Sequence, residues 1–167
     1  AYLPDDAVTI DSRRWCVVNL PESEPVLIVD GSIDERHSYY VASAFAPGQR
    51  VATGVRPEIK RPSFLRDVSV DVLGEFRAIY LLDVSRLDGR GLQNVAEYVR
   101  GGGGLGVFLG DNVDVTFYRD LFYDEGQGVF PIPLERVAVL PPERFENVPD
   151  LEVREHPIFE VFLGERN

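Results

Sequence analysis

Short, continuously apolar segments separated by helical patterns are the feature of this sequence that most constrains its fold. The segments PVLIVDG (25–31), RAIYLLDVS (77–85) and LGVFLGD (105–111) are apolar almost throughout and end in residues that favour turns. Such runs are typical of strands buried on both faces of a parallel sheet. A weaker strand is predicted at 48–59. The alternation predicts a three-layer α/β/α domain with a mostly parallel sheet, whose right-handed crossovers place helices on both faces.

Four helices are predicted between and after these strands. The segment 88–100 has the clearest pattern, because its apolar residues recur at helical spacing and glycines follow it. The segment 34–46 carries acids in its first turn, where carboxylates suit the helix dipole. The other two helices are predicted at 69–76 and 115–123.

Four consecutive glycines stand between the helix predicted at 88–100 and the strand predicted at 105–111. Gly101, Gly103 and Gly106 spell G-x-G-x-x-G, the fingerprint of dinucleotide-binding loops. A dinucleotide loop follows a strand and opens a helix, so that the helix N-terminus faces the pyrophosphate. Here the glycines follow a helix and precede a strand. We therefore expect a helix C-cap and a tight turn, not a cofactor site.

Charge and composition limit the partners of the chain. It has 167 residues and a formal net charge of −11. This acidity disfavours nucleic acid, because phosphate contacts need clustered Lys and Arg. No stretch is long and apolar enough for direct insertion into a membrane. The single cysteine, Cys16, can form neither an internal disulfide nor a Cys-based zinc site.

Two parts of unequal size are predicted along the chain. Residues 1–24 form a β leader, the end of an upstream β domain closed by a Pro-rich, acidic linker. Residues 25–167 form the α/β domain. The chain stops after HPIFEVFLGERN (156–167) without a final strand–helix pair. We therefore expect this domain to be C-terminally truncated and its sheet to keep an unprotected edge.

Acidic residues close three of the predicted strands. The carboxyl ends of parallel strands gather at one edge of the sheet, where ligands of open α/β sheets bind. Carboxylate and hydroxyl oxygens there predict a pocket for Mg²⁺ or Ca²⁺, which prefer oxygen ligands. The alternative is that the acids cap the turns and helices that follow, with no cofactor bound. The candidate pocket residues are Asp30, Ser32, Asp83, Asp111 and Asn112.

A cluster of aromatic residues in the segment 115–123 is the best candidate for a contact surface. It consists of Phe117, Tyr118, Phe122 and Tyr123. Aromatic residues are enriched at the cores of protein–protein interfaces. The alternative interpretation, equally compatible with the sequence, is that these side chains pack against the edge of the sheet.

Several segments taken together resemble a known family. LFYDEGQGVFPIPL (121–134), together with VLIVDG (26–31), AEYVRGGGGLGVFLGD (96–111) and HPIF (156–159), resembles the class I glutamine amidotransferase-like domain of large bacterial envelope proteins, notably from planctomycetes. These proteins look like relatives of the Bat (aerotolerance) family. The resemblance covers most of residues 8–160. It implies a flavodoxin-like fold and a parent protein anchored in a bacterial membrane, with this segment in its soluble part.

The same resemblance bears on catalysis. Enzymes of the superfamily place a catalytic Cys at a sharp turn after the strand that matches GVFLGDN (106–112). This chain has no Cys, Ser or Thr at that turn, and His156 lacks the acid that follows the family's histidine. We therefore expect no catalytic residue and a non-catalytic interaction or ligand-sensing domain, whose partners are other domains of the parent chain or other proteins. The alternative is a hydrolase or divalent-metal-binding domain that uses the carboxylates at the sheet edge. The residues at the turn are Phe108, Leu109, Gly110, Asp111 and Asn112.

Overall fold

The computed structural model describes residues 23–34, 36–48 and 53–137. The described residues up to Leu134 belong to one compact unit, and residues 135–137 belong to a second. The predictions about the β leader, Cys16 and the HPIF segment concern residues outside the described part of the chain.

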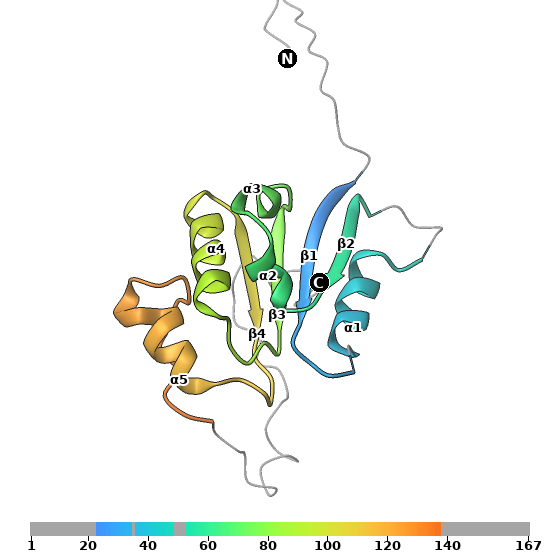
Figure 1. Cartoon of the computed structure of the whole chain (residues 1–167). Helices are drawn as coiled ribbons and strands as arrows, with labels where there is room; N and C mark the ends of the chain where they lie inside the picture. Colours follow the sequence, from blue (N-terminus) through green and yellow to red (C-terminus); the bar gives the residue numbers. More distant parts are fainter. Residues whose placement is uncertain (1–22, 35, 49–52, 138–167) are drawn as a thin grey trace, which may run out of the picture. The chain divides into compact units, whose positions relative to one another are not determined.

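Four parallel strands form the sheet, as Figure 1 shows. They are β1 (Glu24–Asp30), β2 (Val55–Lys60), β3 (Ala78–Leu82) and β4 (Gly104–Phe108). Their order is β2-β1-β3-β4, and each neighbouring pair is parallel. The predicted α/β class and the parallel pairing are therefore confirmed.

Helices connect the strands. They are α1 (Arg36–Phe45), α2 (Ser63–Asp67), α3 (Val70–Leu73) and α4 (Gly89–Arg100). α4 begins where predicted because the carboxylate of Asp88 accepts a hydrogen bond of 2.8 Å from an amide of its first turn. α2 was not predicted, since it is only five residues long and buries a single apolar side chain.

The chain beyond β4 coils in three short turns where one helix was predicted at 115–123. They are α5 (Val115–Phe117), the π-type helix η2 (Tyr118–Tyr123) and the 3₁₀ turn η3 (Asp124–Gly126). Asp114 starts this segment by accepting hydrogen bonds from the two amides at 116 and 117. The segment lies beside α4 (Figure 1).

The glycine run forms the predicted turn. Gly101 caps α4 through a 2.9 Å bond from its amide to the carbonyl of Glu97, and Gly102 has a φ of +97°. At Gly103, a Cβ atom would lie 2.2 Å from the ring of Tyr98. The prediction of a helix C-cap and a tight turn is confirmed, and the side-chain-free positions let the ring of Tyr98 close over the turn.

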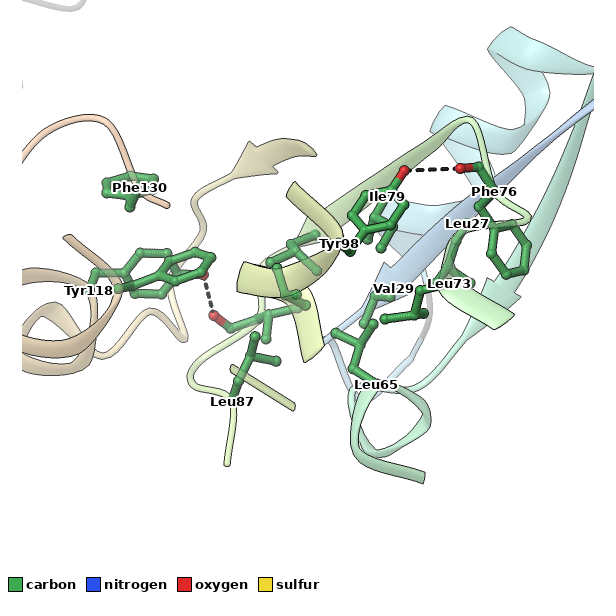
Figure 2. Packing of buried hydrophobic residues seen from close by; sticks show 14 of the residues in the cluster. Leu27, Val29, Leu65, Leu73, Phe76, Ile79, Leu87, Tyr98, Tyr118 and Phe130 are labelled. Atoms are coloured by element: carbon green, nitrogen blue, oxygen red, sulfur yellow. Dashed lines mark hydrogen bonds between the residues drawn. The ribbon is translucent and has the colours of Figure 1, made fainter. Parts of the chain in front are cut away.

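The two faces of the sheet are covered unequally. Leu27 and Val29 of β1, with Ile79 and Leu81 of β3, join the main hydrophobic core, as Figure 2 shows. This face carries α2, α3 and α4. Because side chains alternate along a strand, Ile28 and its neighbours two residues away point to the opposite face. α1 packs on that face over β1 and β2, and we call it the α1 face.

Candidate functional site

The strand order places a topological switch point between β1 and β3. From β1 the chain first crosses to β2 on one side and then returns past β1 to β3 on the other. In open α/β sheets, ligands bind outside the carboxyl ends of the strands at such a point. β1 ends at Asp30, and Asp83 directly follows β3. Two of the predicted pocket residues therefore lie at the place where this fold class binds ligands.

Asp30 is fully buried and fully hydrogen-bonded. Its Oδ1 accepts from the amide of Ser32 at 2.9 Å and from the Ser32 hydroxyl at 2.6 Å, and its Oδ2 accepts from the amide of Ser38 at 2.7 Å. Burial acts to raise the pKa of Asp30, but the hydrogen bonds from Ser32 and Ser38 outweigh it and hold the pKa below its ordinary value. The carboxylate thus ties the end of β1 to the start of α1.

Arg61 fixes the same loop from the other side. Its guanidinium donates to the carbonyl of Ser32 and, at 3.2 Å, to the carbonyl of Ile33. Although Arg61 binds the backbone of Ile33, the Ile33 side chain points outward and is 94% exposed. The loop after β1 is therefore held by its backbone while it presents an apolar side chain to solvent.

Asp83 is also buried and has a left-handed backbone with a φ of +47°. Its Oδ1 accepts from the amide of Asn112 at 2.9 Å, and its Oδ2 accepts from Nδ2 of Asn112 at 2.6 Å. Two glycines make room for this arrangement. A Cβ at Gly31 would lie 2.2 Å from the Asp83 carbonyl oxygen, and one at Gly110 would lie 2.5 Å from its carboxyl group. Asp83 therefore holds the loop after β4, and this close contact requires glycine at positions 31 and 110.

Four of the five predicted pocket residues form two separate pairings. Asp30 is joined to Ser32, Asp83 is joined to Asn112, and Asp111 is exposed. Asp30 is hydrogen-bonded by residues that follow it in the chain, whereas Asp83 is hydrogen-bonded by a residue of the loop after β4. Among the described residues, no group of three or more His, Cys, Asp or Glu side chains is arranged to hold a metal ion.

The turn where the resemblance locates a nucleophile presents apolar side chains. Phe108 ends β4 and is 54% exposed, and Leu109 is 47% exposed. Neither side chain can act as a nucleophile, an acid or a base. This turn therefore exposes the apolar side chains of Phe108 and Leu109 beside the exposed Asp111.

The aromatic cluster predicted as a contact surface lies inside the molecule. Phe117, Tyr118 and Phe122 are each at most 3% exposed, and Tyr123 is half-buried. The Tyr118 ring packs edge-on against Phe122 with 5.3 Å between centroids, and its hydroxyl donates to the carbonyl of Val84 at 2.8 Å (Figure 2). Burial, with the charge of Asp83, raises the pKa of Tyr118 to about 12. Three of these four side chains are therefore buried members of the hydrophobic core.

A different row of aromatic rings lies on the α1 face. The Phe45 and Tyr80 centroids are 5.2 Å apart, and the Tyr80 and Phe108 centroids are 6.4 Å apart. Tyr80 lies close over Gly106, where a Cβ would be 2.8 Å from its ring. We call Phe45, Tyr80 and Phe108 the aromatic row. The aromatic row could not be predicted from the sequence, because AIYLL is apolar at every position and does not show which side chains share a face.

A hollow of about 610 Å³ lies at the opposite, amino edge of the sheet. Glu24, Glu75 and Glu97 line it with Arg77, beside the glycine turn. This edge is not where ligands of open α/β sheets bind. The hollow also lacks a buried polar side chain aimed into it.

Comparison with known proteins gives no assignment: no family model, no curated protein and no solved structure matches this chain. Within the described residues, no helix combines the length and hydrophobicity needed to cross a membrane.

Proposed function

We propose that this chain is a non-catalytic interaction or ligand-sensing domain with a flavodoxin-like fold, part of a larger bacterial envelope protein. The strand order β2-β1-β3-β4 agrees with the first four strands of the flavodoxin order. The family resemblance of the sequence supports the same fold and the same kind of parent protein.

One observation carries the proposal. Both oxygens of each buried carboxylate at the switch point are hydrogen-bonded within the chain: Asp30 accepts from Ser32 and Ser38, and Asp83 accepts from Asn112 of the loop after β4. A general acid, a general base or a metal ligand needs an oxygen that can reach a substrate, a water molecule or an ion. These acids instead serve to position the loops after β1 and β4.

The exposed side chains at this edge support an interaction role. Ile33 follows β1, Phe108 ends β4 and Leu109 follows it, so that apolar groups project at or beside the loops that the buried acids hold in place. Rigidly held apolar groups are suited to binding, because little conformational freedom is lost when a partner covers them.

The competing function, a hydrolase or a divalent-metal-binding domain, is tested through the carboxylates at the sheet edge. Thermal unfolding would be recorded with Mg²⁺, Ca²⁺ or no divalent ion, for the wild type and for Asp111→Asn, and glutamine hydrolysis would be measured in parallel. We expect no metal-dependent shift of the melting temperature and no hydrolysis above the buffer rate. A stabilising shift that Asp111→Asn abolishes, or turnover of glutamine, would overturn the proposal.

A further inference from the structure

The two edge strands of the sheet differ in how they are protected. β2 carries Pro57 within the strand and charged side chains along it, with Lys60 at its end. Proline and charge are the usual means by which an edge strand avoids pairing with another chain. β4, with the sequence GLGVF, has neither. Pairing with a further strand is therefore opposed at β2 and unopposed at β4.

At the free edge of β4, the N–H and C=O groups of two residues point away from the sheet. The carbonyl of Phe108 accepts from the amide of Asp83 at 2.9 Å, so the backbone groups of Phe108 face β3. Because successive residues of a strand alternate, those of Leu105 and Val107 face away from the sheet. Among the described strands β4 pairs with β3 alone, so no described strand pairs with its outward side.

The α1 face is open beside this edge. Tyr80 and Phe108 point to that face, where Phe45 at the end of α1 reaches Tyr80, whereas Phe108 at the end of β4 is 54% exposed. All-parallel sheets occur almost only with both faces covered. An occupant that adds to β4 would extend the sheet and lie next to the aromatic row.

We propose that the occupant is a second copy of this chain, paired antiparallel through β4 about a two-fold axis at Gly106. This inference rests on the proposed interaction role and names its partner. In this register Leu105 and the partner's Val107 form hydrogen-bonded pairs, twice by symmetry. The two four-stranded sheets become one sheet of eight strands.

The sequence of β4 is complementary to itself in this register. Phe108 lies opposite the partner's Gly104, on the same face, so that each exposed ring covers a glycine of the other copy. An aromatic ring over a strand glycine stabilises that pairing, because the ring shields backbone that the glycine leaves exposed. Gly106 meets its own symmetry mate without a side chain to separate the strands. No charge on β4 opposes the pairing, although the chain as a whole is acidic.

The proposal is tested by mass and by amide exchange on the full chain. Light scattering across a dilution series should give twice the mass of the chain at high concentration and the chain's own mass at low concentration. Hydrogen exchange by NMR should show the amides of Leu105 and Val107 protected only in the dimer. The amides of Gly106 and Phe108, which face β3, serve as an internal control and should be protected at every concentration.

Two variants separate edge pairing from loss of fold. Val107→Pro removes an outward N–H and leaves the β3 ladder intact, so dimerisation should weaken about 30-fold because each copy loses one interface bond. Phe108→Lys places a charge on the edge and should weaken dimerisation as well. The matched control is Ile59→Lys on β2, whose side chain is 43% exposed, and it should dimerise normally. Thermal melts would confirm that all three variants fold.

The outcomes distinguish the possible occupants. Protection of Leu105 and Val107 in a species of single-chain mass would overturn the proposal in favour of a strand from the same chain. A monomer with both amides unprotected at every concentration would overturn it as well. Either result leaves the proposed non-catalytic role untouched, because that role is tested by metal binding and glutamine hydrolysis.

Discussion

Replacing Asp30 by Asn removes the charge of a buried carboxylate and keeps its shape. The carboxylate accepts hydrogen bonds on both oxygens, from the amide and hydroxyl of Ser32 on Oδ1 and from the amide of Ser38 on Oδ2. An amide has one accepting oxygen, so its NH₂ group must face either the donors of Ser32 or the amide of Ser38. At least one charge-assisted bond is lost and one buried N–H stays unpaired. We expect Asp30→Asn to lower the free energy of unfolding by about 2–4 kcal/mol.

Urea denaturation measures this loss, with an unchanged m-value showing that the unfolded state is not altered. The control is Asp34→Asn. Asp34 pairs with Arg36 at 2.6 Å, but both side chains are more than half exposed, so its loss should cost less than about 0.5 kcal/mol. If Asp30→Asn is no more destabilising than Asp34→Asn, the carboxylate does not hold the loop as argued.

The pH dependence of the same pair of variants has a defined sign. The pKa of Asp30 is lower in the folded protein than its ordinary value of 3.8. Its contribution is therefore complete above that value and is lost as the pH falls through the folded pKa. The difference between the wild type and Asp30→Asn should be constant near neutral pH and shrink below about pH 4. A difference that instead grows on acidification would contradict the direction of the shift.

Further substitutions test the packing around the site. Gly110→Ala should destabilise the fold by about 1–3 kcal/mol, because its Cβ would lie 2.5 Å from the Asp83 carboxyl group. The control is Gly89→Ala, whose added Cβ meets no atom within 4 Å and which should be neutral or stabilising by up to about 1 kcal/mol. If the two variants change the free energy of unfolding equally in urea denaturation, the predicted clash between residue 110 and Asp83 is refuted. Phe122→Ala should cost about 3–5 kcal/mol because the ring is fully buried, whereas Leu121→Ala, 52% exposed, should change little. Tyr118→Phe should reduce the loss of stability between about pH 10 and the folded pKa of about 12, because ionisation of the buried phenol opposes folding there; an unchanged alkaline melt would show that Tyr118 is not the titrating group.

The strands and the longest helix could be predicted because their signals are local. The apolar runs at 25–31, 77–85 and 105–111 start within one residue of β1, β3 and β4 and run one to three residues past their ends. α4 follows from an apolar stripe, a capping Asp88 and a terminating glycine. α2 could not be predicted, because a five-residue helix that buries only Leu65 has no measurable period.

The position of the candidate site could be predicted from the sequence, but the role of its residues could not. Strand ends must meet at one edge of a parallel sheet, so Asp30 and Asp83 could be located from the sequence. Their hydrogen-bond donors could not be identified, because Ser38 lies eight residues from Asp30 and Asn112 lies 29 residues from Asp83. The exposure of Phe108 and the burial of Phe122 depend equally on tertiary packing. Helical spacing alone gives the same pattern for a buried ring and for a binding surface.

The central claim is that the buried acids of the switch point hold loops and do not bind an ion. The most direct test follows the backbone amide resonances of Ser32, Ser38 and Asn112 while Ca²⁺ or Mg²⁺ is added to the full chain. The account predicts that these three amides keep their chemical shifts and their protection from exchange at every metal concentration. Saturable shifts of these resonances, with loss of amide protection, would show that the carboxylates exchange their loop contacts for a cation and would contradict it.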